Sequence, residues 1–142
     1  MNNYKDLIVW QKSIDLAVKI YESTKEFPKE EMYGLTSQVR RSAVSIASNI
    51  AEGAGRNSKK EFNNFLGISN GSSCELDTQL IIANKVNFLD TQALENIQSD
   101  ILEIQKMNWA LQKSLEITID YLLRTMYYLL RTKYLRLWTH TS

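Results

Sequence analysis

The sequence has very few of the residues that break helices or build redox and metal sites. It contains one proline, five glycines, one cysteine and one histidine among 142 residues. Cys74, being alone, excludes an intrachain disulfide or a cysteine-based metal framework, and His140 has no second histidine with metal-ligand spacing. We therefore expect no metal, no cofactor and a reduced, cytoplasmic setting. Long stretches without proline or glycine favour an all-helical fold.

Signatures of catalysis and of membranes are also missing. The chain has no glycine-rich loop of the phosphate-binding type and no Ser/His/Asp set. No apolar run approaches the roughly 20 residues of a membrane span, and the N-terminal run MNNYKDLIVW lacks the basic-then-apolar pattern of a signal peptide. We predict a non-enzymatic protein with no catalytic residues and no membrane partner.

Helical periodicity is what the sequence does contain. Apolar residues recur every three or four positions through four successive segments. The first segment spans 5–25, and its expected core stripe is Leu7, Trp10, Ile14, Ala17 and Tyr21. The second helix begins either at Pro28, a residue suited to a first turn, or only at Leu35, after Gly34.

Short side chains are frequent in the second helix. Its apolar stripe is interleaved with Ser42, Ser45, Ala47, Ser48 and Ala51. Such side chains let a neighbouring helix approach closely. Gly53 and Gly55 are expected to end the helix, since glycine accepts the left-handed cap conformation without a steric penalty.

The third helix is predicted to run from Ser58 to near Asn87. Ser58 and Glu61 fit a capping box, in which each satisfies a free backbone N–H. Gly67 and Gly71 share one face, and each costs about 1 kcal/mol relative to alanine inside a helix. We therefore expect a close backbone approach at these two glycines.

The fourth helix, capped by Asp90, is predicted to run from Thr91 to at least Ile117. Its apolar seam is typical of a coiled coil with one polar position, Asn108. A buried asparagine at this position would fix the register of the helices, whereas one facing water would not. Both readings stay open.

Residues 118–142 form a second region, a basic tail rich in tyrosine and leucine that follows the bundle at 1–117. The heptad YLLRTMY at 121–127 is followed by YLLRTKY at 128–134, with no glycine or proline before it. One continuous helix over 91–138 would contain 48 residues and extend about 72 Å. Three outcomes are open: a protruding helix that pairs with another copy, a helix folded back on the bundle, or a poorly ordered tail.

Cations are concentrated in two places, although the net charge is only +1. Five lie at 40–60 against the single acid Glu52, and four lie at 118–142 against Asp120. Such a cluster is a candidate contact for nucleic-acid phosphates; the alternative is a solvated helix end with ion pairs between subunits. The candidate nucleic-acid-binding residues are Arg40, Arg41, Arg56, Lys59 and Lys60.

Polar residues also interrupt the apolar stripes, and each needs a hydrogen-bond partner if buried. They are Gln38, Asn49, Glu52, Glu75 and Gln79. Arg40 and Arg41 point about 100° apart on a helix, so at most one lies well inside the bundle. We predict that one of them pairs with Glu75 or Glu52, between helices or between subunits.

Two long motifs carry a resemblance to a known family. YGL-x-x-Q-x-RR-x-x-x-S-I-x-x-N-I-A-E-G runs from Tyr33 to Gly53, and GS-x-x-E-L-x-x-Q-L runs from Gly71 to Leu80. Over residues 4–117 the chain resembles the bacterial four-helix-bundle proteins encoded in intervening sequences of large-subunit ribosomal RNA genes, which are often labelled as a ribosomal-protein family. The tail does not match.

The resemblance implies an antiparallel up-down four-helix bundle assembled into a ring-shaped homopentamer. The same fold includes the accessory variability proteins of diversity-generating retroelements, which carry a positive surface and bind nucleic acid and a reverse transcriptase. We therefore expect an oligomeric bundle that associates with RNA or DNA, with a reverse transcriptase as a further partner by analogy. The alternative is a self-assembling protein–protein interaction scaffold with no nucleic-acid role.

Overall fold

The computed structural model describes residues 3–138, except for the side chains of residue 118 and of residues 132–138. His140 and the end of the tail thus lie outside the described residues. The helices are α1 (Ile8–Ser23), α2 (Leu35–Ala54), α3 (Lys59–Lys85) and α4 (Thr91–Trp138), with short 3-10 turns η1 (Tyr4–Asp6) and η2 (Lys29–Glu31). No strand occurs in the described part of the chain, and the all-helical prediction is confirmed.

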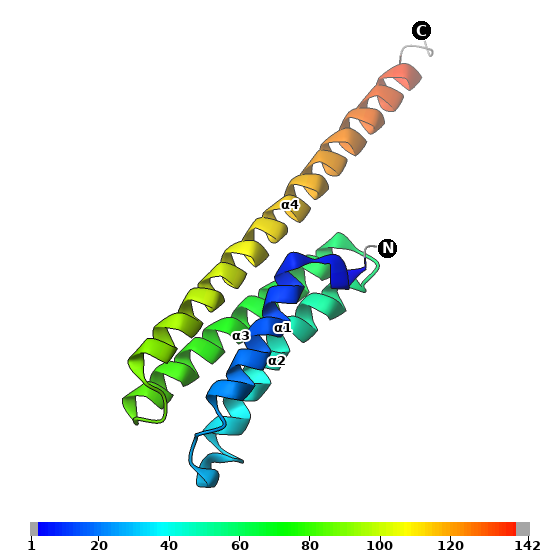
Figure 1. Cartoon of the computed structure of the whole chain (residues 1–142). Coiled ribbons are helices and arrows are strands. Elements are labelled where there is room, and N and C mark those ends of the chain that lie inside the picture. Colours follow the sequence, from blue (N-terminus) through cyan, green and yellow to red (C-terminus); the bar gives the residue numbers. More distant parts are fainter. Residues whose placement is uncertain (1–2, 139–142) are drawn as a thin grey trace.

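Successive helices run in opposite directions and form a bundle (Figure 1). Each helix packs against two others: α1 and α3 both contact α2 and α4. The core between them is built from fully buried aliphatic side chains, among them Leu16, Ile46, Leu76 and Ile104. The predicted four-helix bundle is therefore confirmed.

The predicted core stripe of the first helical segment is only partly right: Leu7, Trp10 and Ala17 pack against the core as partly buried side chains. The structure buries Val9, Ser13, Leu16 and Ile20. Ile14 and Tyr21 of the expected stripe are instead 37% and 45% exposed. Apolar residues lie on two faces of α1, so the period alone did not determine which face the bundle covers.

The glycines of α2 do not act as left-handed caps. No glycine in the described residues has a positive φ, and Gly55 lies in the right-handed region with φ of −81°. Gly53 lies inside α2, where an added Cβ would lie 2.6 Å from Cβ of Phe65. Gly53 is therefore needed for the close approach of α2 and α3. The left-handed position is Asn87, with φ of 64°, just after α3.

The expected close approach at Gly67 and Gly71 does not occur within the chain. A Cβ on Gly71 would meet nothing within 4 Å, and one on Gly67 would meet only the Gln112 amide at 3.8 Å. Both glycines lie on the exposed side of α3. The sequence pattern identified their shared face but not that this face is turned outward.

Helix starts are capped largely as predicted. Ser58 Oγ accepts from the backbone N–H of Glu61 at 3.1 Å, and its hydroxyl donates to the Glu61 carboxylate. Asp90 Oδ1 accepts from the backbone N–H of Ala93 at 2.7 Å. The Glu31 carboxylate accepts from the N–H of Leu35 at 2.9 Å. This last bond explains why α2 begins at Leu35 rather than at Pro28.

The sequence left open whether Asn108 is buried or faces water, and the structure shows that it is buried. It is 0% exposed, and its amide donates to Ser69 Oγ at 3.0 Å and to Asn70 Oδ1 at 3.2 Å. One turn later, Gln112 accepts from the Asn70 amide at 3.2 Å. This polar layer joins α3 to α4 inside an otherwise apolar seam.

The fourth helix continues without a break into the tail and leaves the bundle (Figure 1). Among the three expected outcomes, the structure shows a protruding helix and excludes a helix folded back on the bundle, while its pairing with another copy stays a prediction. Apolar side chains from residue 121 to residue 130 are 53–71% exposed. No change in backbone geometry marks the boundary between residues 117 and 118. We refer to residues 117–138 as the extension.

Candidate functional site

The five predicted nucleic-acid-binding residues fall into two groups. Arg40 and Arg41 lie in the first half of α2, whereas Arg56, Lys59 and Lys60 lie at the turn between α2 and α3. Fifteen residues separate Arg41 from Arg56, which corresponds to about 22 Å along a helix. A single chain thus does not bring the five cations together.

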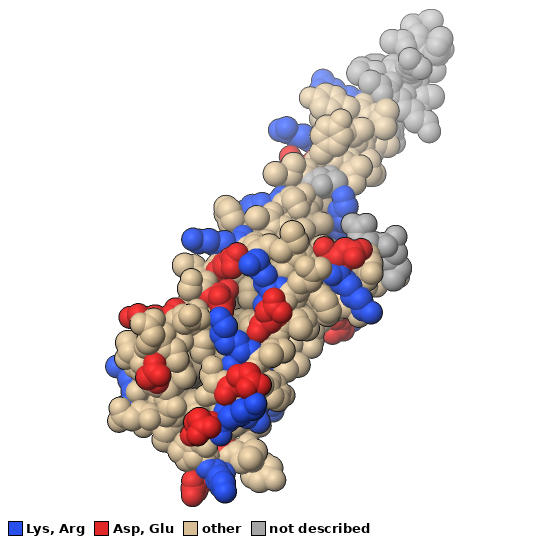
Figure 2. Space-filling view, viewed as in Figure 1, with Lys and Arg blue, Asp and Glu red and all other residues tan. Residues whose placement is uncertain are grey.

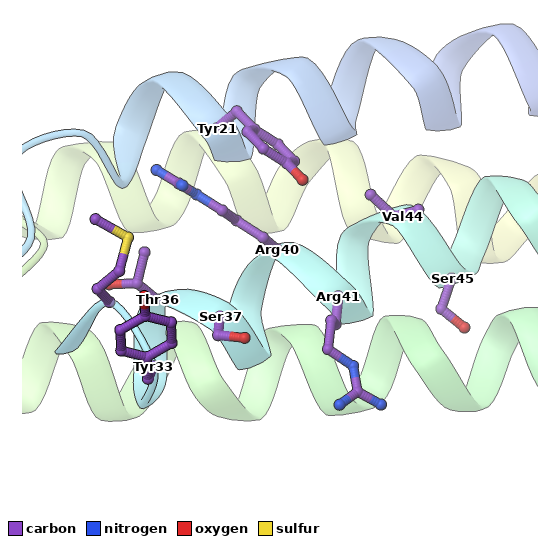
Figure 3. A pocket seen from close by; sticks show the side chains of 9 residues that line it. Tyr21, Tyr33, Thr36, Ser37, Arg40, Arg41, Val44 and Ser45 are labelled. Atoms are coloured by element: carbon purple, nitrogen blue, oxygen red, sulfur yellow. The ribbon is translucent and has the colours of Figure 1, made fainter.

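Arg40 packs against α1. Its Nε donates to Thr24 Oγ1 at 2.9 Å, and its guanidinium carbon lies 4.8 Å from the centre of the Tyr21 ring. Figure 3 shows the side chain reaching towards Tyr21, away from the direction of Arg41. A half-buried cation held over an aromatic ring joins two helices, so Arg40 has a packing contact that its neighbour lacks.

Arg41 is exposed and borders a shallow hollow of about 400 Å³ with Gln38, Ser45 and Glu75. Within the described residues, neither Arg40 nor Arg41 forms an ion pair with Glu52 or Glu75. The hypothesis of an intrachain arginine–glutamate pair is therefore wrong in this form. A pair between subunits stays a prediction.

A larger open depression of about 570 Å³ lies beside Arg40 on the outer face of α2 (Figure 3). Its lining contains no carboxylate, histidine or cysteine. It is bordered by Tyr21, Met32, Tyr33, Thr36, Ser37, Arg40, Arg41, Val44 and Ser45. The side chain of Tyr33 is 97% exposed at its rim.

The turn between α2 and α3 presents the second group of cations. Arg56 donates to Glu52 at 2.5 Å and lies over the Phe65 ring at 4.8 Å. Lys59 and Lys60 are exposed, and neither forms an ion pair with a described acid. These two lysines are the free cations of this turn.

The turn lies at the end of the bundle from which α4 departs. Gln112 of α4 donates to the backbone carbonyl of Asn63 at 3.3 Å, one turn after Lys60. Lys113 Nζ donates to Glu116 at 2.9 Å, and this hydrogen bond together with the charge of Lys113 lowers the pKa of Glu116. The extension with its arginines therefore starts beside the basic turn.

Charges of both signs alternate over the bundle face seen in Figure 2. Several are paired between helices, as in the contact of Lys19 with Asp100 and that of Lys12 with Glu103 at 3.0 Å. On this face the bundle has no contiguous positive belt.

An apolar surface on α1 and α2 escaped the sequence analysis. Ile14, Val18, Tyr21 and Val44 are 37–57% exposed, and Tyr21 and Val44 both border the larger depression. We call these four residues the α1–α2 apolar face. A sequence signal for this face was present, because the first helix contains more apolar residues than one buried face can hold.

The order of the helices and the residues along them match a known family. The profile of the 23S rRNA-intervening sequence proteins matches residues 5–110. The chain belongs to this family. A similar crystal structure, at 1.70 Å, is that of a protein of unknown function from the S23 ribosomal protein family of Bacteroides thetaiotaomicron VPI-5482. The TM-score is 0.69 at 27% identity, over 75% of this chain and 99% of that chain. No curated protein matches the chain.

The polar residues of the family motifs are mostly not buried in this 23S rRNA-intervening sequence protein. Gln38, Glu52 and Glu75 are exposed, and Asn49 is half-buried, where its amide donates to the Ser45 carbonyl at 2.8 Å. Only Gln79 is buried, and its amide donates to Glu75 at 3.2 Å. The motif thus places most of its polar groups where a partner molecule can reach them.

The remaining features of this 23S rRNA-intervening sequence protein concern metals and membranes. Within residues 3–138 no cluster of acidic, histidine and cysteine side chains has the geometry of a metal site. None of the described helices combines the length and apolar character needed to cross a lipid bilayer. Cys74 is exposed on α3.

Proposed function

We propose that this protein is a non-enzymatic, cytoplasmic helical bundle that self-associates and binds the phosphate backbone of RNA or DNA. The contact surface is the basic end of the molecule, which comprises Arg56, Lys59, Lys60, Arg124 and Arg131. The observation that carries this proposal is that Lys59 and Lys60 are free cations at the end of the bundle where the arginines of the extension begin. Because these groups contact phosphates, binding is weakly sequence-specific.

Assembly strengthens the proposal. In the homopentamer that the family resemblance implies, each basic end is repeated around a ring, and several weak contacts act on one strand. Tyr121 and Tyr128 lie beside the arginines of the extension and offer faces on which unpaired bases can stack. A reverse transcriptase is a further partner by analogy with the accessory variability proteins.

Salt dependence of binding tests the proposal. Fluorescence anisotropy with labelled RNA and DNA strands of about 30 nucleotides, at about 50 and 200 mM salt, gives the slope of log affinity against log salt. Replacing Lys59 and Lys60 by glutamine should reduce the magnitude of that slope by about 1.4–1.8, since each lost phosphate contact lowers it by roughly 0.7–0.9.

Lys29 and Lys85 provide the matched control, because they are exposed cations at the opposite end of the bundle. Their double glutamine variant has the same net charge and should bind as the wild type does. Equal losses in the two variants would show that net charge alone attracts the strand. Absence of binding at low salt, with the assembly intact by light scattering, would reject the proposal.

A second candidate function is a protein–protein scaffold with no nucleic-acid role. The observation in its favour is the α1–α2 apolar face, which in a single chain leaves four large apolar side chains in water. Clustered apolar side chains of this kind mark interaction surfaces. This candidate predicts that replacing the cations of the basic end leaves the assembly intact and its function unchanged.

A further inference from the structure

In the described part of the extension, nine large apolar side chains between residues 117 and 130 are exposed to solvent. Near the end of the bundle, Gln112 of α4 donates a hydrogen bond to the Asn63 carbonyl of α3, and Leu115 still packs against the core. Beyond these residues, Ile117 is 70% exposed and Leu123 is 60% exposed. From 117 to 138 the helix runs about 33 Å past the bundle.

Aliphatic residues of the extension lie on one face. At 100° per residue they fall within an arc of about 120°. They are Ile119, Leu122, Leu123, Met126, Leu129 and Leu130, which we call the aliphatic stripe. The same arc contains Asn108, Leu111 and Leu115, which face the bundle. The stripe is therefore the buried seam of α4 continued beyond the helices that cover it.

The charged residues of the extension whose side chains are described, Asp120, Arg124 and Arg131, lie away from this stripe. Arg124 and Arg131 point about 150° from its centre, and Arg124 lies 3.8 Å from Asp120 on the same side. If the stripe marks heptad positions a, d and e, both arginines occupy position f, the one most remote from a partner helix. Two extensions packed through their stripes thus keep Arg124 and Arg131 of each copy away from the contact.

We propose that the aliphatic stripe packs against the extension of a second copy of this chain. Ile119 and Met126, like Leu122 and Leu129, are seven residues apart, so each heptad of one extension meets an equivalent heptad of the other. A lipid surface requires no such repeat, and helices that lie on membranes carry a polar face rich in lysine and arginine. Here the described polar face holds three tyrosines, two arginines and one aspartate. The contact is separate from nucleic-acid binding and from the α1–α2 apolar face.

Disulfide trapping tests this contact directly. Cys74→Ser removes the native thiol, and Met126→Cys then places a single thiol in the stripe near the middle of the extension. At heptad position a it faces its counterpart directly in parallel pairing, and in antiparallel pairing about the middle of the extension the two thiols lie on the same buried face, about one turn apart. Tyr128→Cys in the same background is the control, since Tyr128 lies on the opposite face with similar exposure, 63% against 57%.

Under mild oxidation, the Met126→Cys variant should form a covalent dimer several times faster than the Tyr128→Cys variant, as followed on non-reducing gels. Equal rates would overturn the proposal, because random collision does not distinguish the two faces. A faster dimer from Tyr128→Cys would overturn it as well.

A second measurement uses sedimentation equilibrium. Replacing Leu122 and Leu129 by glutamine should raise the concentration at which copies dissociate by at least about tenfold. The control replaces Tyr121 and Tyr128 by glutamine and should leave that concentration unchanged. An unchanged mass for the leucine variant, with wild-type protein floating on phosphatidylcholine–phosphatidylglycerol vesicles, would overturn the proposal in favour of a lipid surface.

Discussion

Gly53 and Gly71 show how differently two helical glycines are used. An added Cβ on Gly53 would collide with Phe65 and Phe62, whereas one on Gly71 would enter open space. The family motifs contain both glycines, and neither periodicity nor composition separates their roles. Only the packing of α2 on α3 does so, since contact between helices is not encoded in the local sequence.

Alanine at each position gives a matched pair of variants. Gly53→Ala should lower the free energy of unfolding by about 1–3 kcal/mol, because a methyl group is forced into a filled space. Gly71→Ala should raise it by up to about 1 kcal/mol, because alanine favours the helix and meets no neighbour. Urea denaturation measures both. A destabilised Gly71→Ala variant would place this face of α3 in a contact between copies.

At the scale of elements, α4 is tied to α3 by a polar layer rather than by apolar packing alone. Asn108 makes two hydrogen bonds to α3 while fully buried. Such a group fixes the axial register of two helices, because sliding either helix leaves the amide without partners.

Replacing Asn108 by alanine should reduce the free energy of unfolding by about 1–3 kcal/mol, the cost of leaving buried polar groups unsatisfied. Lys106→Ala on the exposed side of the same helix should change it by less than about 0.5 kcal/mol. Thermal unfolding followed by circular dichroism compares the two. If Asn108→Ala is as stable as the wild type, the polar layer does not fix the register.

Helix boundaries were well predicted from sequence, whereas the buried face of α1 was predicted only in part. Ser58 and Asp90 cap helices through bonds to residues three positions away, so the relevant information is local. The face that α1 buries depends on α2 and α4, and Ile14 and Val18 made a second face equally plausible. The point at which α4 leaves the bundle likewise depends on where its neighbours α1 and α3 end.

At the scale of the whole molecule, two surfaces of the single chain leave large apolar side chains exposed to water. The α1–α2 apolar face and the extension are far apart in sequence and lie on different parts of the structure (Figure 1). Two such surfaces permit each copy to contact more than one neighbour. The predicted cations, in contrast, are separated along α2 by about 22 Å, a separation that already follows from the predicted length of the second helix.

Glutamate in place of both Val18 and Val44 should disrupt assembly through the α1–α2 apolar face. These side chains are 57% and 42% exposed, so the single chain tolerates the change, whereas a dry contact between copies does not tolerate a buried unpaired carboxylate. Light scattering should show a smaller particle. Leu102→Glu, on an exposed side of α4 at 51%, is the control and should keep the wild-type mass. An unchanged mass for both variants would leave this face outside the assembly.

The unbroken backbone of α4 makes it a rigid shaft between bundle and extension. One residue inserted near position 117 would turn the outer half by about 100° and advance it by 1.5 Å, whereas eleven residues, close to three full turns, would nearly restore the original phase. Insertions or deletions in this helix thus preserve the relative orientation of its two ends only when they comprise close to a whole number of turns. Any other insertion or deletion rotates the partner bound at the far end of the extension about the helix axis, relative to the partner bound by the bundle.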